Sequence, residues 1–80
     1  MTRIEIIERL TPIASKVFQM DNLVLTDDMS AQTVDAWTSL AFMQLLTAIE
    51  EQFGFKFKMM ELLQLNTMGD IINAIAQHLN

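Results

Sequence analysis

The sequence predicts an all-α protein, a small four-helix bundle of three main helices and one short helix, with a long loop between helices 1 and 2. Apolar residues recur at helical spacing in three long segments. Only two glycines and one proline interrupt the chain, while seven Met and many Leu and Ile favour helix. The β-branched clusters typical of strands are missing. With 80 residues, we expect one domain over residues 1–80.

The first helix is expected over residues 3–18. Thr2 and Glu5 have capping-box spacing, in which each side chain bonds a free backbone N–H of the other residue. Pro12 removes one intrahelical hydrogen bond, but the apolar face keeps its phase. We therefore expect a kink, with Thr11 and Pro12 as a local cap and first-turn pair; a full break at Pro12 is the alternative. The apolar face consists of Ile6, Leu10, Ile13 and Val17.

No helical period survives from Gln19 to Thr38, where Asp, Asn, Thr and Ser dominate. A loop of this length in so small a domain is uncommon unless it has a function. Its apolar side chains are spaced so that they can pin the loop to a core, and they are Leu23, Leu25, Met29 and Val34.

The second helix is expected over residues 39–53. Thr38 suits the N-cap position, and Gly54 suits the left-handed position that follows a helix end. Glu50 and Glu51 are expected on the outer face. The apolar stripe consists of Phe42, Leu45, Leu46, Ile49 and Phe53.

The sequence pattern in the last third of the chain predicts a short helix and a long helix. Phe55 and Phe57 alternate with lysines in an extended stretch, and the two aromatic side chains can pack against a core. A short helical turn is expected over residues 59–64. The final helix begins at Thr67, with Asp70 as its capping-box partner, and is expected to bury Met68, Ile71, Ile72, Ile75 and Leu79.

Composition argues against several classes of function. Ten acidic and five basic residues give a net charge of −5, which disfavours nucleic acid and suits a basic protein partner. No apolar run approaches the ~20 residues of a membrane span. The chain has no cysteine for a disulfide, a thiolate nucleophile or a metal ligand, and we expect a cytoplasmic protein.

An ordinary active site is hard to build from these residues. His78 is the only histidine, and we interpret it as a solvated residue of the last helical turn. Adjacent acids, as at residues 27–28 and 50–51, point about 100° apart on a helix and form no close dyad. No residues show the spacing of metal ligands. We therefore predict no catalytic residue, no metal and no intrinsic catalysis.

Ser39 stands where the long loop ends and the main amphipathic helix begins. Backbone N–H groups are unpaired there and the helix dipole is positive, so a phosphodiester on the hydroxyl would be stabilised. A serine at a helix start usually only caps the helix. Taken alone, the physical argument favours a cap.

Three motifs lie in the order and spacing of a known family. They are DAWTSLAFMQLL (residues 35–46), EEQFG (residues 50–54) and TMGD (residues 67–70). Together they resemble the acyl carrier protein family, whose discrete members show Asp-Ser-Leu, often after Trp, then Glu-Glu-x-Phe-Gly and Thr-Val-Gly-Asp. The likeness covers nearly the whole chain. Peptidyl carriers usually place glycines before the serine, and the absence of those glycines favours the acyl-type branch.

The resemblance implies a carrier without catalytic activity. A phosphopantetheinyl transferase would attach 4′-phosphopantetheine from coenzyme A to Ser39, and the terminal thiol would hold acyl groups as thioesters. Partner enzymes would belong to fatty-acid or secondary-metabolite (polyketide-like) biosynthesis, and we expect a monomer. The alternative is an unmodified, carrier-like helical module that binds proteins through Leu40 and Met43.

The resemblance also implies two sets of site residues. The partner face, whose acids would meet basic patches on enzymes, consists of Leu40, Met43, Thr47, Glu50, Glu51 and Glu61. The acyl cavity would be lined by Phe42, Leu45, Leu46, Ile49, Phe53, Phe57, Leu62, Leu63, Ile71 and Ile75. Plain core packing is the alternative interpretation of every residue in the second set.

The sequence departs from the family at three positions near the serine. Thr38 replaces the usual Asp, and Ala41 and Gln44 stand where acids are frequent. Thr can cap a helix but lacks the charge that modifying enzymes usually contact. The departure fits a specialised carrier with a dedicated modifying enzyme, a poorly modified carrier, or a carrier-like fold that is no longer modified. An engineered change at position 38 is a further alternative.

Overall fold

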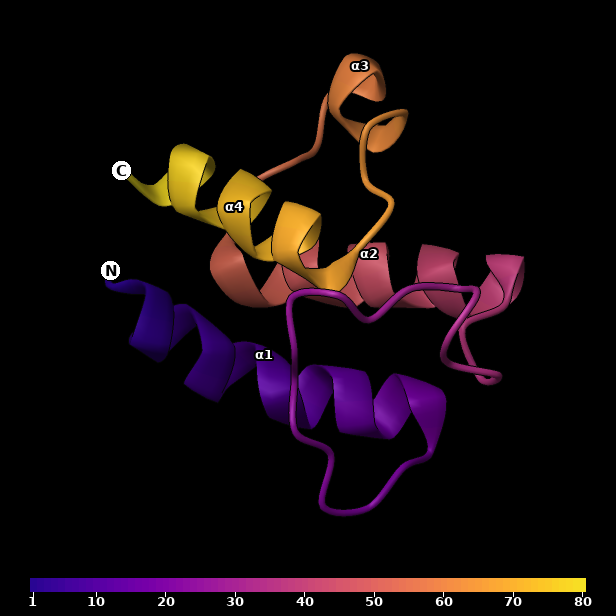
Figure 1. Cartoon of the computed structure of the whole chain (residues 1–80). Coiled ribbons are helices and arrows are strands. Elements are labelled where there is room, and N and C mark those ends of the chain that lie inside the picture. Colours follow the sequence, from indigo (N-terminus) through magenta and orange to yellow (C-terminus); the bar gives the residue numbers. More distant parts are fainter.

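A computed structural model describes all 80 residues of the chain. The helices are α1 (Arg3–Phe18), α2 (Ser39–Phe53), α3 (Met59–Leu62) and α4 (Met68–Leu79). The predicted all-α bundle with its long first loop is confirmed, although α3 ends at Leu62 rather than at residue 64. Figure 1 shows α3 apart from the other helices and both termini at the end of the molecule opposite the start of α2.

The core forms where α1 packs against α2 and α4. Each fully buried aliphatic side chain contributes about 1.5–3 kcal/mol relative to exposure. Because the chain has no cysteine, this burial is not supplemented by disulfides. The largest fully buried side chains are Ile6, Leu10, Leu45, Ile49, Met68, Ile71, Ile72 and Ile75.

Helix α1 runs without a break through Pro12. The capping box between Thr2 and Glu5 is present, as predicted. The predicted local cap at Thr11 is wrong, because its hydroxyl donates to the Ile7 carbonyl at 2.7 Å and thus bonds the preceding turn.

The long loop is tied to the first turn of α4 through backbone hydrogen bonds. Met68 N–H donates to the Met29 carbonyl at 2.8 Å, and Gly69 N–H donates to the Asp27 carbonyl at 3.0 Å. These N–H groups have no partner within their own helix. A Cβ at Gly69 would lie 3.1 Å from Asp27 atoms, so the contact favours glycine. The four predicted pins of the loop all pack on the core, Met29 and Val34 buried and Leu23 and Leu25 half-buried.

Helix α4 begins with the predicted capping box. The Asp70 carboxylate accepts the Asn66 N–H at 3.0 Å and the Thr67 N–H at 3.1 Å. These bonds, chiefly the one from Asn66, hold the pKa of Asp70 below its ordinary value. The ionised form of Asp70 therefore stabilises the folded chain.

Replacing Asp70 with Asn is expected to lower the free energy of unfolding by about 1 kcal/mol at pH 7. Since folding lowers the pKa of Asp70, the ionised carboxylate stabilises the fold above the unfolded pKa of about 3.9. That contribution is lost as pH falls through the folded pKa. Urea unfolding should show the difference between wild type and variant shrinking toward pH 3. An equal difference at both pH values would contradict this account, and Asp35→Asn, at an exposed residue, is the control.

Candidate functional site

Ser39 is the first residue of α2 and is exposed to solvent. The preceding Thr38 is the N-cap, and its hydroxyl accepts the Ala41 N–H at 3.1 Å. The interpretation of Ser39 as the cap is therefore wrong. Because Thr38 caps the helix, the Ser39 hydroxyl forms no hydrogen bond within the chain and is accessible for chemistry.

The start of α2 is electropositive because of its backbone. No acidic residue lies in the first turn, so nothing neutralises the positive end of the helix dipole. The N–H groups of Ser39 and Leu40 have no partner within the chain. Free N–H groups at a helix start favour a phosphate group close to them.

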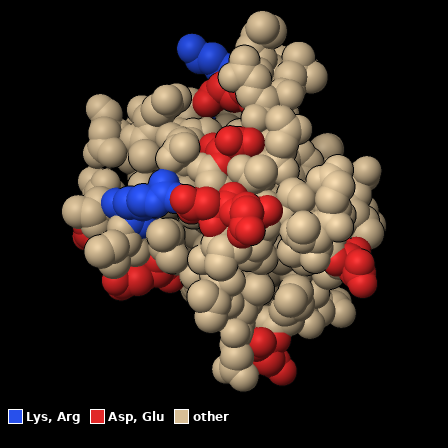
Figure 2. Space-filling view, in the orientation of Figure 1, with Lys and Arg blue, Asp and Glu red and all other residues tan.

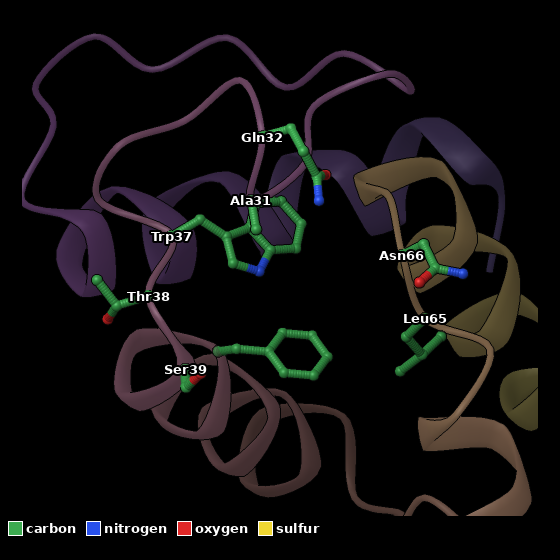
Figure 3. Close-up of a pocket in the computed structure, with 8 residues that line it drawn as sticks. Ala31, Gln32, Trp37, Thr38, Ser39, Leu65 and Asn66 are labelled. Carbon is green, nitrogen blue, oxygen red and sulfur yellow. The ribbon is translucent and has the colours of Figure 1, made fainter.

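A hollow of about 240 Å³ opens beside Ser39. Figure 3 shows the Trp37 indole and Leu65 facing each other across it, with Ser39 at the edge where α2 begins. The hollow combines apolar walls with polar groups at its rim. Its lining residues are Ala31, Gln32, Trp37, Thr38, Ser39, Phe42, Leu65 and Asn66.

Two aromatic side chains that line this hollow, Trp37 and Phe42, also belong to a stack of three rings that reaches the core. The Trp37 ring stacks on Phe18 with centroids 5.5 Å apart and on Phe42 with centroids 6.1 Å apart. Trp37 is only 6% exposed. In the sequence, Trp37 stands out only as part of the family motif. No sequence pattern indicates Gln32 and Leu65, which reach the hollow from the long loop and from the segment after α3.

Of the ten residues predicted to line an acyl cavity, only Phe42 lines a hollow. Leu63 is wrongly predicted, because it is 71% exposed beside a helix that buries no residue. Leu62 is half-buried but does not pack against the core, whereas Phe57 packs at its edge. The others are buried in a closed core, and they are Leu45, Leu46, Ile49, Phe53, Ile71 and Ile75.

The predicted partner face is exposed at Leu40, Met43, Thr47 and Glu51. The expectation that Glu50 also lies on the outer face is wrong. Its carboxylate accepts the backbone N–H of Phe57 at 2.8 Å and lies 3.7 Å from the Lys56 ammonium. Only 19% of this side chain remains exposed, so the carboxylate holds the segment after α2 in place.

Glu61 is also held within the chain. Its carboxylate accepts the Lys58 N–H at 2.8 Å and lies 2.8 Å from His78 Nε2. The bond from the Lys58 backbone, helped by His78, lowers the pKa of Glu61. The interpretation of His78 as solvated is wrong, because its ring stacks on Phe55 with centroids 4.2 Å apart. The pair of Glu61 and His78 tethers α3 to the end of α4.

Replacing Glu61 with Ala is expected to loosen α3 without unfolding the bundle, because α3 buries no residue of its own. A four-residue helix is marginal without such support. Hydrogen exchange should become faster at the amides of Glu61, Leu62 and Leu63, while amides in α1 keep their protection. Glu51→Ala is the control, since Glu51 is exposed. Unchanged exchange in α3 would show that the tether is unimportant.

Comparisons with known proteins agree with this geometry. The family described as the phosphopantetheine attachment site matches residues 8–75. The fold is similar to the solution NMR structure of a holo acyl carrier protein from Geobacter metallireducens. That match has a TM-score of 0.84 and 38% identity and covers 91% of this chain and 84% of that chain. The chain belongs to the acyl carrier protein family.

No curated protein matches the chain. No helix combines the length and apolar character that crossing a membrane requires.

The residues at the start of α2 fit the cofactor of this family, covalently attached 4′-phosphopantetheine. An exposed hydroxyl can form the phosphodiester bond, and the electropositive helix start favours the phosphate charge. The adjacent hollow leaves open space beside the attachment point. Family membership implies a phosphopantetheinyl transferase and biosynthetic enzymes as the classes of partner.

Proposed function

We propose that Ser39 is the attachment residue for 4′-phosphopantetheine and that the chain carries acyl intermediates as thioesters. One observation supports this assignment above all others. Within a chain of the carrier family, the Ser39 hydroxyl is exposed, free of hydrogen bonds and placed at the uncompensated positive end of α2. Ser15 and Ser30, the other serines, are half-buried and buried.

The residues around Ser39 have different roles in holding the 4′-phosphopantetheine arm. Thr38 caps α2 and so leaves the Ser39 hydroxyl free. In the transferase this hydroxyl would lose its proton and attack the pyrophosphate of coenzyme A, so that the pyrophosphate bond breaks, the new phosphodiester forms and adenosine 3′,5′-bisphosphate leaves. The N–H groups of Ser39 and Leu40 stabilise the phosphate charge. Trp37 and Leu65 offer an apolar surface along which an attached chain can rest. When bound, 4′-phosphopantetheine supplies the terminal thiol that holds the acyl group.

The proposed carrier performs no catalysis itself. It delivers acyl groups to synthase, loading or transferase enzymes of fatty-acid or polyketide-like biosynthesis in the cytoplasm. The acidic composition, with a net charge of −5, supports a protein partner over nucleic acid. We propose that residues 1–80 form a single carrier domain and act as a monomer.

A second candidate function is an unmodified interaction module. Thr38 favours this alternative, because it lacks the charge usual beside a modified serine. The exposed Leu40 and Met43 also favour it, as they offer a binding surface that does not depend on an arm. Measuring modification directly separates the two functions.

Incubation with coenzyme A and a broad-specificity phosphopantetheinyl transferase is expected to add one arm to the chain. Intact-mass spectrometry should show a single addition on wild type and on Ser15→Ala. It should show none on Ser39→Ala. Absence of any addition on wild type would favour the unmodified module, and an addition that persists in Ser39→Ala would place the site elsewhere.

Replacing Thr38 with Asp is expected to raise the rate of modification about two- to fivefold, the equivalent of one exposed ion pair. Asp caps a helix as well as Thr does, so the fold should be unchanged. Thr38→Asn supplies the same cap without charge and serves as the matched control. Equal rates for all three proteins would show that the charge at position 38 is irrelevant to the transferase.

A further inference from the structure

The outer side of α2 next to Ser39 is apolar and uncharged. Leu40 is 69% exposed and Met43 is 64% exposed. Residues three apart on a helix are neighbours on one face, so these two side chains form one surface. Contiguous exposed apolar surface is a feature of protein contact sites, and Met adapts its shape to varied partners.

This surface continues along α2 into two hollows. A shallow depression of about 370 Å³ begins at Met43, and a groove of about 400 Å³ lies between α1 and α2. The two hollows share Gln44, Ala48 and Glu51. Of the groove's charged residues, Lys16 and Glu51 have opposite signs and cancel. Uncharged hydrogen-bonding groups come from Gln19, Gln44 and Gln52.

The acids of this region form no cluster. Glu50 and Glu61 are bonded within the chain, and no residue from Ser39 to Ile49 is charged. Free acids lie at the two ends of the surface, at Asp35 before α2 and at Glu51, which borders both hollows. On the side where α2 begins in Figure 1, Figure 2 shows acidic side chains and no Lys or Arg. A basic patch on a partner would therefore meet no charge on the surface between Ser39 and Ile49, and its free acidic contacts there would be Asp35 and Glu51 at the two ends.

We infer that the neutral α2 face, defined by Leu40, Met43, Gln44, Thr47 and Ala48, receives an enzyme surface of apolar and uncharged polar side chains without a Lys/Arg cluster. The inference rests on the proposed function, because an enzyme acting at Ser39 must contact Leu40 beside it. It also changes the predicted partner from an enzyme with a basic patch to one matched by shape. Such docking depends little on salt, whereas steering between opposite charges falls steeply with ionic strength.

Steady-state modification of the intact chain by a broad-specificity phosphopantetheinyl transferase tests this inference. Between 25 and 400 mM NaCl, kcat/KM of wild type should change less than about twofold, against tenfold or more for a steered pair. Leu40→Ala and Met43→Ala should each raise KM about fivefold or more with little change in kcat. Val24→Ala, at a residue 77% exposed in the long loop, is the matched control. The double variant Gln44→Glu/Thr47→Glu should stay insensitive to salt, because a partner without a Lys/Arg cluster offers no opposite charge.

Several outcomes would overturn the inference. A tenfold loss of kcat/KM with salt in wild type would show that charge steers the encounter. Unchanged KM in both alanine variants, with full modification at the end point, would refute the docking face and leave the proposed function intact. No modification under any condition would refute both the docking face and the proposed function. A dimer in sedimentation velocity that Met43→Ala abolishes would assign the face to a second copy of the chain.

Discussion

The aromatic stack of Phe18, Trp37 and Phe42 determines where Ser39 stands. Trp37 is buried between the rings of the other two. The end of the long loop is therefore held inside the protein, and the chain returns to the surface at Thr38. Aromatic pairs contribute about 0.5–1.5 kcal/mol each beyond their burial. The stack thus joins α1 to α2, bounds the hollow and places the next serine at the surface.

Much of the fold could be predicted because its signals act over a few residues. The bounds of α1 and α2 follow from apolar periodicity and from caps such as Thr2 and Thr38. Gly54 adopts a φ of 78°, as expected of a glycine after a helix end. Each of these features depends on residues within one helical turn, which a sequence displays directly. The place of Ser39 at the start of α2 was predictable from the end of the loop and the helical period, whereas its modification stays a prediction.

The site's surroundings depend on contacts between distant residues, which periodicity does not show. Helical phase placed Glu50 and His78 in solvent, whereas the structure bonds Glu50 to the backbone of Phe57 and His78 to Glu61. The hollow also depends on contacts between distant residues. The long loop and the segment before α4 both line it, and an isolated bridge between Ser30 and Thr67 joins these two segments beside it. The acyl cavity was expected from the family, but here the bundle packs tightly and the open space lies at the surface.

The burial of Trp37 has a consequence for how the molecule can be observed. The chain contains one Trp and no Tyr, so its near-ultraviolet fluorescence arises essentially from a single indole. That indole forms a wall of the hollow beside Ser39. Whatever enters the hollow changes the polarity around the only strong fluorophore in the protein. The carrier therefore contains its own optical reporter, positioned by the fold and needing no added label.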